Sequence, residues 1–298
     1  PQSSFPELAI ALGVPELWLN REDLHHFGSH KGRSIPFMID HYWHKEGLLN
    51  FVISSSGNAA LAAALHVKHH NTNNPDKLIS LKIFVGNKIP IEKLSKLTEL
   101  ADEQIILEQV ANPRQTAFQV DSKGEAKLLR QSTDDLALKG YQELAEELNH
   151  IPNLQAIFIP TSSGTTAQAL GEFFQTLEQK PEIHIVQTKA VHPIADSFQN
   201  VMCPTHGKFV EDPETSVAGA IVDKIANRKF PVVEAIVSSQ GKGWIVTDEQ
   251  IKAAIAIVKE KANIDISANS ALSIAGLSEA VMNGKKFTGA VVCLITGK

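Results

Sequence analysis

The sequence predicts an α/β protein of two domains, each built on a mainly parallel sheet flanked by helices. Short β-rich runs alternate along the chain with longer amphipathic runs. Most of the short runs are continuously apolar, which is typical of strands covered on both faces. A length of 298 residues is enough for two ordinary domains. The repeated β-then-α order favours parallel strands joined by right-handed crossovers.

Each expected element follows from its local pattern. Strands are expected at Leu17–Leu19, Phe51–Ile53, Ile79–Val85, Gln104–Glu108, Ala156–Ile159, Ile183–Gln187, Val232–Val237 and Val291–Ile295. Helices are expected at Lys31–Lys45, Asn58–His70, Ile91–Leu100, Asp134–Leu148, Gly164–Leu177, Asp248–Ala262 and Ala268–Met282. Thr247 and Gln250 have the spacing of a capping box at the start of one of these helices.

Polar loops suggest where the domains divide. His69–Lys77 is rich in asparagine and histidine, and Asn149–Asn153 contains a proline. We expect a larger domain of residues 1–47 and 151–298 and a smaller domain of residues 48–150.

Composition excludes several classes of function. The formal net charge is −5 and no basic block recurs, so we expect no nucleic-acid partner. No apolar run approaches the roughly 20 residues that span a bilayer, and no signal peptide is evident, so we expect no membrane partner. Only Cys203 and Cys293 occur, which argues against a disulfide framework. These features favour a cytoplasmic protein.

Lys31 stands out because it falls where a helix is expected to begin, within Phe27–Ser34. The partial positive charge of a helix N-terminus disfavours a cation there. The same field favours the neutral amine that Schiff-base chemistry needs. Taken alone, a solvated loop lysine is the more common explanation.

Two further segments place small polar residues between a strand and a helix, where ligands bind in open α/β sheets. Ser54–Asn58 could offer backbone amides and hydroxyls to a carboxylate, although a serine-capped turn explains it equally well. Thr161–Thr165 could bind a phosphate in the same way. It is neither a Walker A loop nor a dinucleotide fingerprint.

Together these segments resemble the pyridoxal-phosphate enzymes of the tryptophan synthase β-like fold (fold type II), most closely threonine synthase and threonine dehydratase. Gly28–Arg33 is similar to the family's G-S-F-K-x-R segment, and Ser55–Asn58 to its S-G-N loop. The resemblance implies pyridoxal 5'-phosphate as cofactor, Lys31 as the catalytic lysine of the internal aldimine, and a homodimer. It also implies binding roles: substrate carboxylate at Ser55, Ser56, Gly57 and Asn58, and cofactor at Asn58, Ser162, Ser163, Gly164 and Thr165.

The C-terminal Leu294–Lys298 resembles the L-T-G-x-G-x-K ending of threonine synthases. By that resemblance the Thr296 hydroxyl faces the pyridine nitrogen. A hydroxyl does not hold that nitrogen protonated as an aspartate does, so elimination and replacement compete better with transamination.

The resemblance implies a lyase that acts on a small amino acid by elimination or replacement at the β or γ carbon, in the manner of threonine synthase. A serine or threonine ammonia-lyase and a non-catalytic cofactor-binding homologue are the alternatives. The chain departs from the family at His25–Phe27, which replaces Asn-Pro-Thr, and keeps a single glycine in the phosphate loop. His66 and His70 have a zinc-compatible spacing without the rest of a metalloprotease motif, so we predict no metal site.

Overall fold

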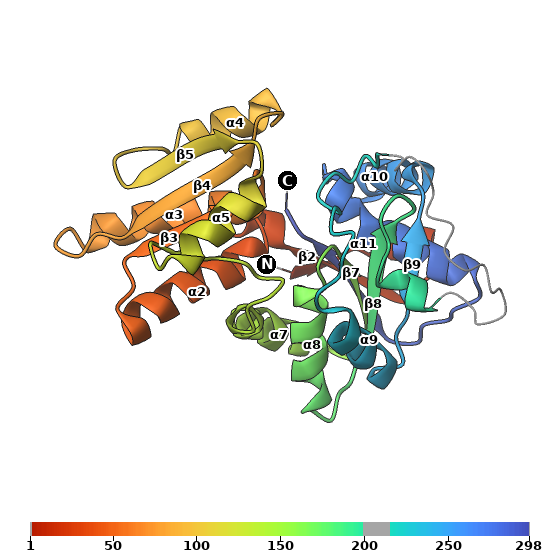
Figure 1. Ribbon diagram of the computed structural model, residues 1–298. Coiled ribbons are helices and arrows are strands. Elements are labelled where there is room, and N and C mark those ends of the chain that lie inside the picture. Colours follow the sequence, from red (N-terminus) through yellow and green to blue (C-terminus); the bar gives the residue numbers. More distant parts are fainter. Residues whose placement is uncertain (1, 199–214, 298) are drawn as a thin grey trace. The chain divides into compact units, whose positions relative to one another are not determined.

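The computed structural model describes residues 2–198 and 215–297, so Cys203 and Lys298 lie outside the described residues. The chain forms two compact units. The first unit comprises the chain up to Leu24 and from Tyr141 onwards, and the second unit is His25–Gly140. Both are α/β units with largely parallel sheets, as predicted (Figure 1).

The first unit contains a six-stranded sheet in the order β1-β2-β10-β7-β8-β9. Only β1 is antiparallel to its neighbour. The strands are β1 (Gln2–Ser4), β2 (Glu16–Arg21), β7 (Leu154–Pro160), β8 (Glu182–Thr188), β9 (Gly243–Val246) and β10 (Ala290–Ile295).

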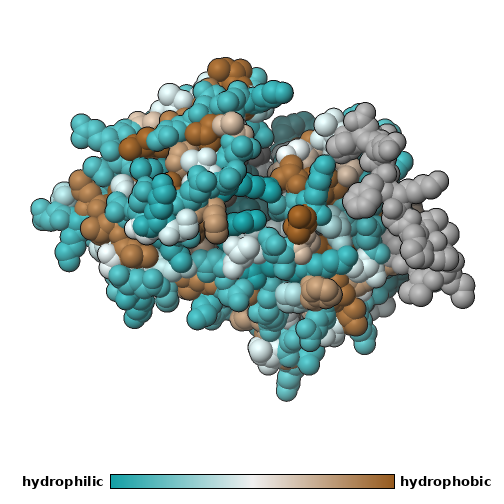
Figure 2. Space-filling view, viewed as in Figure 1, coloured by the Kyte–Doolittle hydropathy of each residue, from teal (hydrophilic) through white to brown (hydrophobic). Residues whose placement is uncertain are grey.

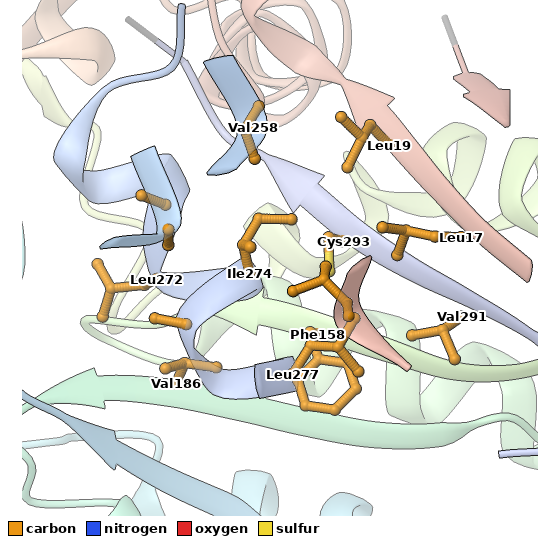
Figure 3. Close-up of a cluster of buried hydrophobic side chains, with 14 of the residues drawn as sticks. Leu17, Leu19, Phe158, Val186, Val258, Leu272, Ile274, Leu277, Val291 and Cys293 are labelled. Carbon is orange, nitrogen blue, oxygen red and sulfur yellow. The ribbon is translucent and has the colours of Figure 1, made fainter. Parts of the chain in front are cut away.

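The helices of the first unit are α1 (Pro6–Leu12), α7 (Gln142–Asn149), α8 (Thr165–Gln175), α9 (Lys229–Ser238), α10 (Asp248–Ala262) and α11 (Ala268–Met282), with short 3-10 turns at Glu22–Leu24 and Ala195–Phe198. Helices α1, α10 and α11 contribute to a large apolar core with the strands. In Figure 3, side chains of α11 such as Ile274 and Leu277 pack against strand residues such as Phe158 and Cys293. Burial raises the pKa of the Cys293 thiol, which therefore behaves as an apolar group.

The second unit contains a four-stranded parallel sheet in the order β5-β4-β3-β6. Its strands are β3 (Asn50–Ser54), β4 (Ser80–Gly86), β5 (Ile105–Val110) and β6 (Lys127–Leu128). Its helices are α2 (Lys31–Glu46), α3 (Asn58–Asn73), α4 (Ile91–Thr98), α5 (Pro113–Ser122) and α6 (Leu136–Lys139). The alanine-rich face of α3 packs with Ile35, Met38 and Ile39 of α2 in one buried cluster.

Helix α2 therefore belongs to the second unit, whereas the sequence-based division at residues 47 and 48 assigned it to the larger domain. The reason is packing, because the buried face of α2 contacts α3 and α6. The Ser34 hydroxyl donates to the carbonyl of Ala137 in α6 at 2.8 Å. The chain returns to the first unit at Tyr141, close to the expected boundary after His150.

Two sequence-based elements were wrong. Val232–Val237 was expected to be a strand and is part of helix α9. Its buried residues Val232, Ala235 and Ile236 are spaced three and four apart, so they form one helical face. The strand in this region is the short β9 that follows it.

The single helix expected over Asp134–Leu148 is two helices, α6 and α7. Gly140 lies between them, and a Cβ added there would meet the Cα of Ser34 at 2.5 Å. The chain needs a glycine at this close approach.

The face shown in Figure 2 is mostly hydrophilic, with hydrophobic residues scattered among polar ones, as on ordinary protein surfaces. Among residues 2–198 and 215–297, no helix is long and apolar enough to cross a membrane.

Candidate functional site

Lys31 is the first residue of α2, as the sequence predicted. The preceding residue, His30, has helical backbone angles and makes no side-chain cap. The Ser29 hydroxyl, two residues before Lys31, is buried and has no hydrogen-bond partner among the described residues. Sequence reasoning did not identify Ser29, because its burial depends on the fold.

Lys31 lies at the same end of the second unit as the Ser55–Asn58 turn. The Asp40 carboxylate of α2 accepts a hydrogen bond from His66 of α3 at 2.8 Å, and the rings of Trp43 and His70 are 4.4 Å apart. In both pairs the α3 residue lies 26 or 27 positions after its α2 partner, so the contacts advance along both helices together and α2 and α3 run in the same direction. Adding the same 26 or 27 positions to Lys31 gives Gly57, the N-cap of α3, and Asn58, its first residue.

The turn between β3 and α3 leaves the start of α3 open to a ligand. Ser55 Oγ accepts from the Gly57 amide at 3.2 Å, and Gly57 is an extended N-cap. No side chain caps the described first turn of α3, and no acidic residue lies in it. Amides at a helix start attract an anion such as a carboxylate. The candidate carboxylate site predicted at Ser55, Ser56, Gly57 and Asn58 therefore has suitable local geometry.

In the first unit, the predicted phosphate loop and Thr296 lie at the same edge of the sheet. Ser162–Thr165 follows β7, Thr296 follows β10, and these strands are parallel neighbours. Carboxyl ends of parallel strands are the usual ligand-binding edge. Thr296 is buried, with 6% of its surface exposed. The next residue, Gly297, is held at the start of α11, where the hydroxyls of Ser270 and of the N-cap residue Ser267 donate to the Gly297 carbonyl at 2.8 Å and 2.6 Å.

Gly164 gives the predicted phosphate loop its shape. It is the N-cap of α8 and has φ +90°, a left-handed conformation that favours glycine. A Cβ at this position would meet Val232 Cγ2 at 2.5 Å. The loop therefore approaches α9 more closely than another residue would allow.

The hydroxyls of the loop are ordered by partners close in space. Ser163 and Thr165 hydroxyls are 3.0 Å apart. Ser162 Oγ donates to the Asp223 carboxylate at 3.1 Å and accepts from the Asp223 amide at 3.3 Å. Asp223 was not identified from the sequence, because it is 61 positions from Ser162 and belongs to no motif.

A family model described as pyridoxal-phosphate dependent enzyme matches residues 2–297. The chain belongs to this family. The predicted family, fold class and cofactor are thereby confirmed.

Two relatives share less than a quarter of the aligned residues with this chain. A threonine synthase of Halalkalibacterium halodurans is 24% identical over 258 residues, covering 85% of this chain and 69% of that protein. An L-threonine ammonia-lyase of Thermotoga maritima is 22% identical over 274 residues, covering 91% of this chain and 65% of that protein. The chain thus spans about two thirds of the length of these relatives.

Solved structures agree on the fold. Threonine deaminase isoform 2 of Solanum lycopersicum aligns with a TM-score of 0.80 and 20% identity, covering 100% of this chain and 78% of that one. Maize serine racemase aligns with a TM-score of 0.81 and 18% identity, covering 100% and 87%.

The residues present fit pyridoxal phosphate in both units. In the first unit, the Ser162–Thr165 loop of small hydroxyl side chains leads into the start of α8, where backbone amides attract an anion, and Gly164 lets this loop lie close to Val232. In the second unit, Lys31 begins a helix beside the unpartnered Ser29 hydroxyl. Among the described residues, no group of three or more His, Cys, Asp or Glu side chains could hold a metal ion.

Proposed function

We propose that the protein is a pyridoxal-phosphate-dependent lyase acting on a small amino acid, with threonine synthase-like elimination or replacement at the β or γ carbon. The observation that carries the proposal is that α2 and α3 run in the same direction and begin at the same end of the second unit. Lys31, which begins α2, is therefore at the same end as the Ser55–Asn58 turn, which leads into α3. A threonine synthase and a threonine ammonia-lyase among the relatives support this class of reaction.

Lys31 is proposed to carry the cofactor through its Nζ, and the Ser162–Thr165 loop to bind the phosphate. Asn58 and Thr296 are proposed to contact the ring, Thr296 through its hydroxyl at the pyridine nitrogen. When bound, pyridoxal phosphate supplies an electron sink conjugated to the substrate α carbon. A hydroxyl at the ring nitrogen keeps this sink mild, which favours elimination and replacement over transamination.

The substrate carboxylate is proposed to bind the Ser55–Asn58 turn, through the amides that begin α3. Binding there fixes the orientation of the α C–H bond relative to the ring. The Lys31 amine would serve as the general base that takes the α proton.

The Lys31 assignment is tested by borohydride reduction of the cofactor-loaded protein, followed by proteolysis and mass analysis. We expect the reduced cofactor on the peptide that contains Lys31. Lys31→Ala should lose turnover and the label. It should still bind the cofactor, with lower affinity than the wild type. Lys45→Ala, at the exposed end of the same helix, is the matched control and should keep both. A label on another lysine, or full activity in Lys31→Ala, would refute the assignment.

The reaction is identified by following phosphate and keto-acid release from O-phosphohomoserine, L-threonine and L-serine. Phosphate release with threonine formation supports a synthase. Keto acid from threonine or serine supports the ammonia-lyase alternative, for which the Thermotoga maritima relative is the specific support. Cofactor binding without turnover of any of the three supports a non-catalytic homologue.

Homodimeric assembly and a cytoplasmic location stay predictions from the sequence. Light scattering of the cofactor-loaded protein at several concentrations tests the first, and fractionation of the source cells tests the second.

A further inference from the structure

Asn20 is a polar residue at a buried strand position that apolar residues usually occupy. It is fully buried near the end of β2, and neither its Oδ1 nor its Nδ2 has a hydrogen-bond partner among the described residues. A carboxamide offers two donors and an acceptor oxygen, and burying them without partners costs free energy. Leucine has a similar size without that cost. An orphaned group of this kind calls for an explanation, such as a ligand that supplies the missing partner.

The register of the sheet locates Asn20 next to the strand that leads to Thr296. Asn20 pairs with Leu294 of β10. Their neighbours Leu19 and Ile295 both belong to the core cluster that includes α11. Because side chains alternate along a strand, Asn20 and Leu294 share the opposite face. Thr296, two positions beyond Leu294, continues on that face at the carboxyl end.

A second orphaned atom lies on the other side of Asn20. Gln2 of β1 pairs with Asn20 across the antiparallel ladder. Gln2 donates through Nε2 to the Glu147 carbonyl at 3.0 Å, but its Oε1 is buried and without a partner among the described residues. An internal water shared by Gln2 and Asn20 is therefore the competing explanation, since such waters bind two to four polar groups.

We infer that Asn20 is a positioning residue for the bound cofactor and acts through Thr296. The inference rests on the proposed function. A Thr296 hydroxyl that donates to the pyridine nitrogen keeps lone pairs on its oxygen. Asn20 Nδ2 donates to that oxygen and fixes the direction of the hydroxyl proton. Without the cofactor Asn20 has no hydrogen-bond partner among the described residues. A Thr296 hydroxyl that turns toward the ring nitrogen presents its oxygen to Asn20, so the bond forms only in the loaded protein.

This role predicts effects of opposite sign on the apo and loaded protein. Asn20→Leu removes an unsatisfied buried amide from the apo protein, so we expect its Tm to rise by about 3 °C. The same change removes a bond present only in the loaded state, so we expect about tenfold weaker pyridoxal phosphate binding. The visible absorption maximum of the bound cofactor should also shift, because the hydrogen bond at the ring nitrogen is altered.

The experiment measures apo Tm, cofactor affinity by absorbance titration, and the absorption maximum for wild type, Asn20→Leu and Gln2→Met. Gln2→Met is the matched control, because it removes the neighbouring orphaned oxygen and should leave affinity and spectrum unchanged. Asn20→Ser serves the same titration if the leucine variant does not fold, and should also weaken binding and shift the maximum.

Wild-type affinity and spectrum in the Asn20 variants would overturn the inference while leaving the proposed function intact. Equal loss of affinity in Gln2→Met would overturn it in favour of the internal water. A wild-type protein that binds no pyridoxal phosphate would overturn the proposed function as well.

Discussion

At the scale of single residues, backbone conformation decides which side chains the predicted phosphate loop can carry. Gly164 combines a left-handed φ of +90° with a 2.5 Å approach of Val232 to the position of a Cβ. Gly284 has nearly the same φ, +85°, but nothing lies within 4 Å of its Cβ position. Comparing substitutions at the two glycines therefore separates the cost of backbone strain from the cost of steric crowding.

Gly164→Ala should lower the free energy of unfolding by more than Gly284→Ala does. Both variants place an alanine at positive φ, which costs about 1 kcal/mol, and only the first also displaces Val232, which adds about 1–3 kcal/mol. Urea unfolding of both variants measures the difference. Gly164→Ala should also bind pyridoxal phosphate more weakly, whereas Gly284→Ala should not. Equal destabilisation by the two variants would show that the contact with Val232 is easily relieved.

At the scale of elements, capping chemistry and most hydrophobic runs predicted the structure correctly, and one hydrophobic run did not. The capping box predicted from Thr247 and Gln250 is confirmed at the start of α10, with both reciprocal bonds present. The apolar run Val232–Val237 was assigned to a strand because β-branched residues favour strands. Tertiary packing overrides that preference, since α9 lies against α8 where Gly171 allows Ala235 to approach.

Thr247→Ala should lower the free energy of unfolding by about 1 kcal/mol, because the Gln250 amide at the start of α10 loses its side-chain acceptor. Thr247→Ser keeps the hydroxyl and should retain most of the stability. Chemical denaturation of both variants gives the comparison. A serine variant as unstable as the alanine variant would show that the methyl group, and not the cap, matters here.

At the scale of the whole molecule, local pattern predicted the parallel sheets and the loops at their edges, and long-range packing decided the rest. Ser55–Asn58 and Ser162–Thr165 were recognisable because a small polar loop between a strand and a helix is a local signal. The membership of α2 in the second unit depends on contacts with α3 and α6. The burial of Asn20 depends on strands that are distant in sequence. A single sequence does not contain such contacts as a local pattern.

A buried histidine links the stability of the first unit to pH. His184 of β8 stacks on Phe158 with ring centroids 4.5 Å apart. Its Nδ1 accepts from the Lys242 amide at 3.0 Å, and its Nε2 donates to the Glu182 carboxylate at 2.9 Å. Burial lowers the pKa of His184 by more than Glu182 raises it. The folded protein therefore holds the imidazole neutral, with its lone pair already used at Nδ1.

Because the folded pKa of His184 is below its ordinary value of 6.5, the unfolded chain takes up the proton first as pH falls. The contribution of neutral His184 to the free energy of unfolding is fully present above pH 6.5. It declines below that pH, by at most about 1.4 kcal/mol per pH unit. His184→Gln keeps an acceptor without a titrating ring, so it should flatten the decline in unfolding free energy between pH 6.5 and 5. Urea unfolding across that range measures the slope, and His69→Gln, an exposed histidine of the second unit, should leave it unchanged. An identical slope in His184→Gln and wild type would mean that other groups carry the acid sensitivity.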